Sequence, residues 1–380
     1  MMAPEKFVSP NAVMSYAVEL ASRGLGRVEP NPAVGAVLVD EHLNLLADGY
    51  HEKFGGPHAE VNALSDFATR VEDAGFRQEL LAGATLFVTL EPCCHHGKTP
   101  PCSEALLKAG IRRVSVGMRD PSPHVDGGGI EQLQKAGVDV SIGVGEELVR
   151  QLNAPFLKRL SQGLPWVHAK WAMTLDGKIA TRTGKSKWIS GEASRQRVHL
   201  LRGRMDAIIV GVGTARADDP LLTVRVPGPR TPVRVVVDSA ASLSLQSRLV
   251  KTLDEAPVLL AVSRNAPKER IERLRDAGVD VLVVESAEPK VDLRQLLEEL
   301  GRRSMTNVLI EGGGQLLGAA FDDGLIDETH IFVAPKFAGG ADAVTPVAGI
   351  GVEVIPEACQ LITQTVEQVG DDIYIHGRLH

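Results

Sequence analysis

The chain has 380 residues, of which 44% are hydrophobic, so it is long and apolar enough for two domains with sizeable cores. Its net charge of −7 argues against a nucleic-acid partner, because such proteins usually present a basic face. No apolar run is long enough to span a membrane and Met1–Pro10 has no apolar core, so we expect a cytoplasmic protein with a small-molecule substrate.

Strand-like and helix-like segments alternate along the chain, which is typical of an α/β protein. Serine followed by proline predicts a helix that begins at Ser9-Pro10 and ends near Gly24. Further strands are predicted at 33–39, 85–90, 114–117 and 138–144, and helices at 58–68, 103–109 and 129–136. This part of the chain therefore predicts a parallel or mixed sheet covered by helices.

A break in the pattern divides the chain. Residues 146–160 predict a charged amphipathic helix, and Ser161-Gln162-Gly163-Leu164-Pro165 predicts its end. We place the boundary there, with one domain at 1–160 and another at 161–380. The second domain has its own predicted strands at 166–173, 207–210, 233–237, 258–262, 281–284, 308–310 and 330–333.

The first domain carries a metal-binding pattern in Pro57-His58-Ala59-Glu60, Pro92-Cys93 and Cys102. One imidazole and two thiolates leave a fourth position open on tetrahedral zinc, as in catalytic sites. Glu60 is then free to move protons, the arrangement of zinc-dependent base deaminases. We predict a catalytic Zn²⁺ at His58, Cys93 and Cys102, with Glu60 serving the attack of a bound water on an amino-substituted ring carbon.

Other interpretations of the same residues remain open at this point. Cys94 as a fourth ligand would make the site structural, although adjacent cysteines rarely bind one ion. Cys102 begins a predicted helix, so we expect its thiol to ionise easily. Thiols committed to metal indicate a reducing compartment, and Cys359 is predicted to lie in the core.

Two glycine-rich loops follow predicted strands in the second domain, Gly211-Val212-Gly213-Thr214 and Gly312-Gly313-Gly314. Such loops cradle phosphates or simply form tight strand–helix turns, and Arg216 stands where a dinucleotide motif would have its third glycine. Arg202, Arg216 and Arg225 suit either a phosphate or a solvated surface. Trp188 suits either a nicotinamide neighbour or packing.

The chain resembles the bifunctional deaminase–reductase family of riboflavin biosynthesis along essentially its full length. The first-domain motifs that carry the resemblance are Asn31–Gly35, Gly49–His51, Pro57–Glu60, Thr89–Cys93, Thr99–Cys102 and Asp120-Pro121. Those of the second domain are Lys170, Thr174–Lys178, Ser186–Ile189, Asp218–Pro220, Leu222–Arg225, Glu311–Gly313 and Ala334–Lys336.

The resemblance implies a cytidine-deaminase-like α/β/α domain followed by a dihydrofolate-reductase-like α/β domain. It implies hydrolysis of the 2-amino group of 2,5-diamino-6-(5-phosphoribosylamino)pyrimidin-4(3H)-one. NADPH would then reduce the ribosyl side chain to give 5-amino-6-(5-phosphoribitylamino)uracil. We also expect a homo-oligomer.

The resemblance also implies the site residues. Beyond zinc at His58, Cys93 and Cys102 and proton transfer by Glu60, the implied deaminase substrate contacts are Asn31, His51, His95, Lys98 and Asp120. The implied cofactor contacts are Ala172, Trp188, Thr214, Asp218, Ser239, Gly313, Gly314, Gln315, Leu316, Leu317, Gly318 and Ala319. The implied reductase substrate contacts are Ser186, Arg202, Leu222, Arg225 and Glu311. Several have an ordinary alternative: Asn31 before a proline shapes turns, His51 suits a surface position, Lys98 suits a solvated loop, and Leu222 suits packing.

One departure and one competing function stand beside this interpretation. The family's Asp-Pro-Asn-Pro is Asp120-Pro121-Ser122-Pro123 here, which shortens a polar side chain. The alternative function is a nucleoside or tRNA deaminase with a non-reductase second domain, and the acidic charge weighs against tRNA. A non-catalytic zinc module would need a fourth protein ligand. The pattern identifies no general acid for the reductase.

Overall fold

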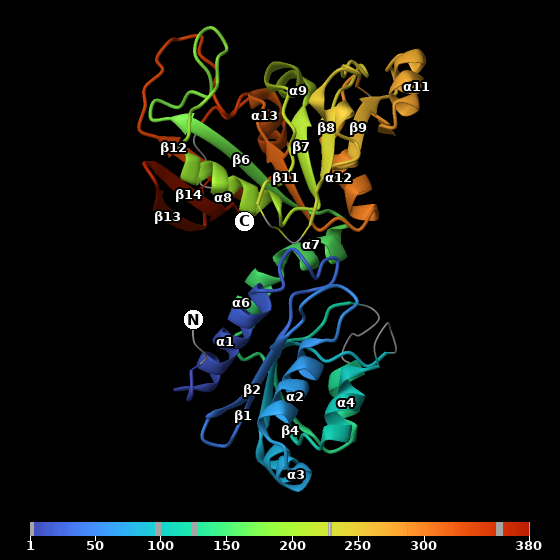
Figure 1. Cartoon of the computed structure of the whole chain (residues 1–380), viewed down its shortest axis with the longest axis vertical. Helices are drawn as coiled ribbons and strands as arrows, with labels where there is room; N and C mark the ends of the chain where they lie inside the picture. Colours follow the sequence, from blue (N-terminus) through green and yellow to red (C-terminus); the bar gives the residue numbers. More distant parts are fainter. Residues whose placement is uncertain are drawn as a thin grey trace. The chain divides into compact units, whose positions relative to one another are not determined.

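The computed structural model describes residues 4–95, 100–122, 128–226, 228, 230–286, 288–354 and 360–379. The chain divides into two compact units, Met1–Ser161 and Gln162–His380 (Figure 1). This division lies one residue from the boundary placed on the sequence pattern. Among the described residues, no helix has the length and apolar character needed to cross a membrane.

The first unit is built on a five-stranded mixed sheet in the order β2-β1-β3-β4-β5, within the described residues. Its strands are β1 (Gly35–Val39), β2 (Leu45–Tyr50), β3 (Thr85–Leu90), β4 (Arg113–Met118) and β5 (Asp139–Ile142). β1 runs antiparallel to β2 and β3, whereas β3, β4 and β5 are parallel. All residues of β1 are buried, as expected for a strand covered on both faces.

Helices cover both faces of this sheet and make three layers. They are α1 (Pro10–Ser22), α2 (Ala59–Arg70), α3 (Ala74–Gly83), α4 (Cys102–Ala109), α5 (Gly128–Lys135), α6 (Glu146–Leu152) and α7 (Ala154–Gln162). Val13 and Val149 from α1 and α6 pack with Val37 and Phe87 on one face. α2, α4 and α5 cover the opposite face.

Two predictions at helix ends have clear outcomes. Ser9 caps α1, accepting a hydrogen bond from the Ala12 N–H at 3.2 Å, with Pro10 in the first turn as predicted. The single helix predicted over 146–160 is wrong, because α6 and α7 are separated at Asn153. The Asn153 side chain bonds to the backbone of a distant segment, described below.

The strand β2 was absent from the sequence prediction, because Asp48 and Gly49 interrupt its apolar pattern. Gly49 is there for a packing reason: a Cβ at this position would lie 2.4 Å from the backbone nitrogen of Ala63 in α2. Glycine therefore lets α2, which the predicted metal ligand His58 precedes, approach the sheet closely.

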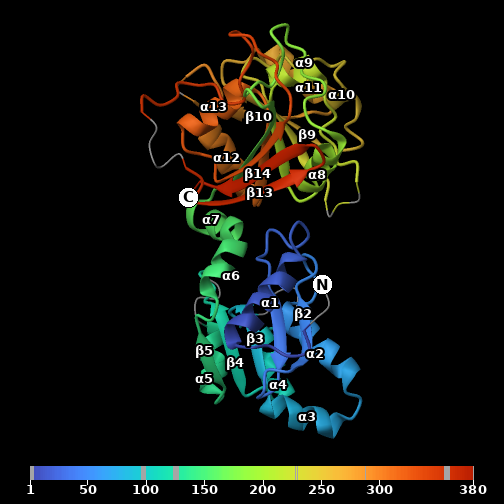
Figure 2. The ribbon, with the colours of Figure 1, turned by 90° about the vertical axis from the view of Figure 1, so that its left-hand side faces the viewer.

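The second unit is built on a nine-stranded sheet in the order β10-β9-β8-β7-β11-β6-β12-β14-β13, within the described residues. Its strands are β6 (Trp166–Thr174), β7 (Ala207–Gly211), β8 (Val233–Val237), β9 (Val258–Ser263), β10 (Asp280–Val284), β11 (Asn307–Glu311), β12 (Glu328–Ala334), β13 (Thr363–Val369) and β14 (Asp372–Arg378). The strands β6 to β12 are parallel, and β14 and β13 add an antiparallel hairpin at one edge (Figure 2).

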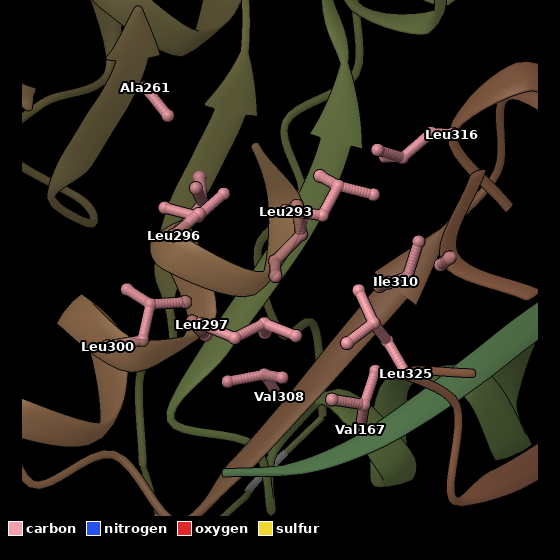
Figure 3. Close-up of a cluster of buried hydrophobic side chains, with 14 of the residues drawn as sticks. Val167, Ala261, Leu293, Leu296, Leu297, Leu300, Val308, Ile310, Leu316 and Leu325 are labelled. Atoms are coloured by element: carbon pink, nitrogen blue, oxygen red, sulfur yellow. The ribbon is translucent and has the colours of Figure 1, made fainter. Parts of the chain in front are cut away.

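Helices also lie on both faces of the second sheet. They are α8 (Glu192–Arg202), α9 (Val212–Asp218), α10 (Arg248–Lys251), α11 (Lys268–Asp276), α12 (Leu293–Arg302) and α13 (Gly314–Asp322). Figure 3 shows Leu293, Leu296, Leu297 and Leu300 of α12 facing the sheet, where Val308 and Ile310 of β11 lie. That spacing places the leucines on one helical face. α9, α10 and α11 pack on the opposite side.

Candidate functional sites

The three predicted metal ligands come together from separate elements of the first unit. His58 precedes α2, Cys93 follows β3, and Cys102 is the first residue of α4. His58 Nδ1 lies 3.5 Å from Cys93 Sγ and 3.2 Å from Cys102 Sγ. Tetrahedral zinc, with bonds of about 2.0–2.3 Å, separates its ligand atoms by about 3.5 Å. The donor set therefore fits a zinc ion in both chemistry and spacing.

A fourth protein ligand is absent from this cluster as far as the described residues extend. Cys94 is turned toward α5, because a Cβ on Gly128 would lie 2.8 Å from its Sγ atom. Among the described residues the arrangement is therefore the three-ligand set that catalytic zinc sites use.

The start of α4 holds Cys93 in place. The Cys102 N–H donates to Cys93 Sγ at 3.3 Å, and the Ser103 N–H donates to the Cys93 carbonyl at 3.2 Å. The hydrogen bond between the two thiols lowers the pKa of Cys93 to about 4 and raises the pKa of Cys102. The predicted preference for Cys102 does not follow from this geometry, because the N–H at the helix start donates to the sulfur of Cys93.

Glu60 lies in the first turn of α2, only 3% exposed, and its carboxyl group interacts with the Cys102 thiol. Burial raises the pKa of Glu60 to about 7. A carboxyl group with a pKa near neutrality can accept a proton and give it back. It lies beside the ligand cluster, where proton transfer to and from a bound water would be needed.

Glu91, to which the sequence pattern assigned no role, fixes the segment that carries Cys93. Its Oε1 accepts hydrogen bonds from the Gly129 and Ile130 N–H groups at the start of α5, both at 3.1 Å. Its Oε2 accepts from the Asp120 N–H at 3.2 Å. A Cβ on Gly129 would lie 1.8 Å from the Pro92 carbonyl oxygen, so glycine is required for this contact.

The predicted substrate contacts of this unit differ in what surrounds them. His51 is buried, its Nδ1 hydrogen-bonds the Pro57 carbonyl at 2.9 Å, and its Nε2 has no protein partner. Burial lowers the pKa of His51, so the ring is neutral and Nε2 can accept a hydrogen bond. The His51 ring also lies edge-on to His58, with centroids 5.4 Å apart. His95 is exposed, and Lys98 lies outside the described residues.

Asp120 is buried, and burial raises its pKa. Its Oδ1 accepts a hydrogen bond from the Ser122 backbone N–H at 2.9 Å. This turn uses the backbone of Ser122, so the exchange of the family's asparagine for serine leaves it intact.

Asn31 is held in place from a distant helix junction. Asn153 is 2% exposed, its Oδ1 accepts from the Ala33 N–H at 2.8 Å, and its Nδ2 donates to the Ala33 carbonyl at 3.0 Å. One side-chain amide thus satisfies both backbone groups of a residue two positions from Asn31. Arg159 donates to the Pro30 carbonyl at 3.3 Å.

In the second unit the two glycine-rich loops lie side by side at the carboxyl ends of β7 and β11. A Cβ on Gly313 would lie 3.1 Å from Thr214 Oγ1. Gly312 and Gly313 have φ of 77° and 86°, which favour glycine. They lead into the start of α13, where the first backbone N–H groups have no carbonyl partner within the helix. In open α/β sheets ligands bind at the carboxyl ends of the strands.

The predicted run Gly313–Ala319 is divided between this loop and the core. Leu316 and Leu317 are buried in the core cluster. A Cβ on Gly318 would lie 1.9 Å from the Ala348 carbonyl oxygen. Within the run, Gly313, Gly314 and the exposed Gln315 are therefore at the loop and first turn, and the later residues face packed protein.

A buried ionic cluster lies next to these loops. Arg202 of α8 binds both carboxylate oxygens of Glu311, at 2.5 and 2.8 Å, and Lys170 Nζ of β6 lies 3.8 Å from Glu311 Oε2. Although burial acts to raise it, the pKa of Glu311 is lowered to about 2 by Arg202. Burial lowers the pKa of Lys170. Burial lowers the pKa of His199, and the nearby positive charges of Arg202 and Arg225 lower it further.

The segment around Trp188 is tied to the same edge. The Ser186 hydroxyl donates to Asp218 Oδ1 at 3.1 Å, and Lys336 Nζ donates to the Trp188 carbonyl at 3.1 Å. The Trp188 ring is 66% exposed, with the Arg195 guanidinium 4.8 Å from its centroid. An exposed indole held by its backbone is available to a ligand.

The remaining predicted positions of this unit have different surroundings. Leu222 is buried in the core, so its side chain cannot line a site and only its backbone could contact a ligand. Ser239 follows β8 and accepts from the Val291 N–H at 3.1 Å. Ala172 is half-buried in β6, and Arg225 is exposed. Lys170, which the sequence pattern left without a role, is the addition that the structure makes to this site.

Comparison with known proteins gives matches to both units. The family described as the RibD C-terminal domain matches residues 165–375, and the cytidine and deoxycytidylate deaminase zinc-binding region matches residues 9–118. Riboflavin biosynthesis protein RibD from Actinobacillus pleuropneumoniae is 43% identical over 95% of this chain and 93% of its own length. RibD from Aquifex aeolicus is 40% identical over 95% and 96%.

Solved structures match over both units as well. A Thermotoga maritima diaminohydroxyphosphoribosylaminopyrimidine deaminase/5-amino-6-(5-phosphoribosylamino)uracil reductase is 36% identical, with a TM-score of 0.81 over 97% of this chain and 98% of that one. RibD from Acinetobacter baumannii is 37% identical, with a TM-score of 0.80 over the same shares. The predicted fold, a deaminase-like unit followed by a reductase-like unit, is confirmed.

Proposed function

This chain belongs to the RibD family of riboflavin biosynthesis, and we propose that its two units act in succession on one phosphoribosyl pyrimidine. It is a bifunctional enzyme, a deaminase followed by a reductase. The proposed substrate is 2,5-diamino-6-(5-phosphoribosylamino)pyrimidin-4(3H)-one, which loses its 2-amino group as ammonia. The observation that carries the deaminase half is the His58–Cys93–Cys102 cluster with buried Glu60 beside it.

In the deaminase unit, His58, Cys93 and Cys102 would hold Zn²⁺. When bound, that ion supplies a water whose pKa is low enough for nucleophilic attack at neutral pH. Glu60 would carry one proton of that water to the ring nitrogen and the other to the departing amine, so that the water oxygen becomes the ring carbonyl and the amine leaves as ammonia. Its raised pKa supports both directions of transfer.

Substrate recognition in this unit is proposed for Asn31, His51, His95, Lys98 and Asp120. The support is strongest for His51, whose buried Nε2 has no protein partner and sits on a ring in contact with the ligand His58. A hydrogen-bond donor of the substrate would satisfy this nitrogen. Asn31 is supported by the Asn153 clamp, which fixes the backbone of Ala33 two residues away.

In the reductase unit, we propose that NADPH lies along the two glycine-rich loops and, when bound, supplies the hydride. Ala172, Trp188, Thr214, Asp218, Ser239 and the run Gly313–Ala319 are the proposed contacts, with the last four of the run acting through packing. Backbone N–H groups at the start of α13 suit a pyrophosphate.

The ionic cluster would receive the substrate's ribosyl arm. Arg202 and the exposed Arg225 suit the phosphate, and Ser186, the Leu222 backbone and Glu311 would contact hydroxyl groups. Reduction to the ribityl product needs a proton as well as a hydride. We propose Lys170 as the donor of this proton. Burial lowers the pKa of its amine, and the Glu311 carboxylate, with Oε2 3.8 Å from Lys170 Nζ, positions it.

A single assay tests both halves. Purified protein is given the diaminopyrimidine substrate with and without NADPH, while ammonia release and NADPH oxidation are followed. Ammonia should appear without NADPH, and oxidation should follow deamination. Glu60→Gln should keep the zinc, leave the reductase step intact when the deaminated intermediate is supplied, and slow deamination by about 10²–10⁴-fold. Deamination at the wild-type rate in that variant would refute the role of Glu60.

Two coarser properties complete the proposal. We propose a cytoplasmic enzyme, because three of its four cysteines lie at or beside the proposed zinc site, as suits a reducing compartment. We also propose a homo-oligomer, which light scattering on the purified chain would test by its mass.

A further inference from the structure

A second group of side chains whose types can bind a metal lies in the reductase unit, apart from the glycine-rich loops. His168 is on β6, Glu328 and His330 are on β12, and His376 is on β14, three strands that are neighbours in the sheet (Figure 1). His168, Glu328 and His330 lie in the amino-terminal halves of the parallel strands β6 and β12, and His376 of the antiparallel strand β14 pairs with His330. The glycine-rich loops, in contrast, follow the carboxyl ends of the parallel strands. None of the functions described above uses them.

The ligand atoms of three of these residues converge on one point. His168 Nδ1 lies 3.1 Å from His330 Nε2, and each lies 3.7 Å from Glu328 Oε1. Tetrahedral zinc, with bonds of about 2.0–2.2 Å to nitrogen and oxygen, separates such atoms by about 3.4 Å. The three side chains are only 5–10% exposed. The spacing is therefore that of a metal site, inside the protein.

The atoms of these residues that face away from the shared point each have a hydrogen-bond partner, as the outer atoms of metal ligands usually do. His168 Nε2 lies 3.3 Å from Asn307 Oδ1, and His330 Nδ1 lies 2.7 Å from the Tyr374 hydroxyl. Both partners can accept an N–H proton, which leaves the inner nitrogens with free lone pairs. Glu328 is oriented through its other oxygen, Oε2, which accepts from Trp166 Nε1 at 3.0 Å.

The proton balance allows the same residues to exist with or without a metal. Without one, Tyr374 would donate to His330 Nδ1, His330 Nε2–H to His168 Nδ1, and His168 Nε2–H to Asn307 Oδ1. When a divalent ion enters, the His330 proton would move from Nε2 to Nδ1, and this N–H would donate a hydrogen bond to the Tyr374 oxygen. No proton has to leave the protein, and the Glu328 carboxylate offsets part of the added charge.

Access and a fourth ligand come from β14. His376 Nε2 hydrogen-bonds Glu328 Oε1, and its side chain is 33% exposed, more than those of the other three. It stacks on His330 with ring centroids 4.7 Å apart. An ion could therefore reach the cluster past His376, which would either complete the coordination or leave that position to water.

We propose that His168 Nδ1, His330 Nε2 and Glu328 Oε1 form a second metal site, which takes a divalent transition-metal ion such as Zn²⁺ and ties the β12–β14 edge of the sheet to β6. Imidazole and carboxylate ligands without sulfur suit zinc and its first-row neighbours. Because a metal bound only by the folded chain stabilises it, the site would raise the stability of the reductase unit.

The first experiment leaves the cluster intact and removes the other site. Separate samples of the full-length Cys93→Ser protein are loaded with Zn²⁺ or with Co²⁺ and freed of excess metal. The metal content of both samples and the absorption spectrum of the cobalt sample are then measured. The expected result is one equivalent of metal, with visible cobalt bands but no sulfur-to-cobalt charge transfer. A chain without retained metal would overturn the proposal. Charge transfer would place the ion on the remaining thiol and overturn it as well, whatever the fate of the deaminase proposal.

Variants of the cluster supply the second test. In the Cys93→Ser chain, Tyr374→Phe should weaken zinc binding by about 10–100-fold, the usual effect of losing a partner of a metal-bound histidine. His330→Gln should abolish it. Tyr16→Phe, which removes a tyrosine hydroxyl from the other unit, is the matched control and should leave the affinity unchanged. Equal zinc affinity in the Tyr374→Phe and Tyr16→Phe proteins would refute the proposed geometry.

Discussion

The clamp that Asn153 places on Ala33 gives a sharp test of how the deaminase site is held. Asn153→Ala removes two hydrogen bonds, at 2.8 and 3.0 Å, and leaves the Ala33 N–H and carbonyl buried without partners. Each such orphaned group costs about 1–3 kcal/mol, and water entering the vacated space recovers part of this. We expect a loss of about 2–4 kcal/mol in the stability of the first unit.

For a unit of this size, such a loss lowers the midpoint of thermal unfolding by roughly 4–16 °C. Scanning calorimetry of the full-length protein would measure it. Because Asn31 lies two residues from the clamp, deaminase kcat/KM should fall as well, while reductase kcat/KM, assayed on the deaminated intermediate, should not change. The reductase thus serves as a control within the same molecule.

Gln151→Ala is the matched control variant, since Gln151 lies on the same helix and its amide makes an exposed contact with Glu147. It should change stability by no more than about 0.5 kcal/mol. If Asn153→Ala unfolds at the same temperature as Gln151→Ala and deaminates at the wild-type rate, the clamp has no energetic role and the reasoning fails.

Three further predictions concern the reductase unit. Because the folded pKa of Glu311, about 2, lies below the ordinary value of 4.5, the residue stabilises the unit above about pH 4.5 and loses this contribution as pH falls toward 2. The free energy of unfolding should therefore fall less steeply with decreasing pH in Glu311→Gln than in the wild type. Equal slopes would contradict the ion pair. Arg225→Ala should raise KM for reduction and spare deamination, and an equal loss in both steps would remove Arg225 from this site. Arg234, wholly buried, donates to the carbonyls of Leu221, Thr252 and Ala256; Arg234→Met should cost about 3 kcal/mol or more in denaturant unfolding, and a change below about 0.5 kcal/mol would show that these contacts are replaceable.

Much of the fold followed from local patterns in the chain. The strands β1, β3 and β7 to β11 are apolar runs between turn residues. Such runs predict strands well here, because both faces of the two sheets are covered and the strands are therefore apolar on both sides. The hairpin β13–β14 was not predicted. Its first strand is almost wholly exposed and polar, and a strand at the edge of a sheet is specified by its pairing partner rather than by its own apolar pattern.

The candidate zinc site was predictable for a chemical reason. Few residue types bind zinc, and the spacing of one histidine, one glutamate and two cysteines is distinctive. Residue identity and order along the chain were therefore enough to name His58, Glu60, Cys93 and Cys102 as candidates. Which of the two thiols the helix start favours was not predictable, because it depends on which sulfur receives the helix N–H group. That is a matter of ångströms and has no counterpart in the residue order.

The chain order alone therefore determined the class of chemistry, the two-part organisation and the candidate zinc ligands, all of which depend on residue type and local spacing. Tertiary structure alone decided which groups support them. Asn153 meets Ala33 across 120 residues, Glu91 caps α5 beside Cys93, Lys170 joins Arg202 at Glu311, and Tyr374 orients His330. These partners are ordinary polar residues. Each acquires its role because folding buries it next to one polar group that needs a hydrogen-bond or ionic partner.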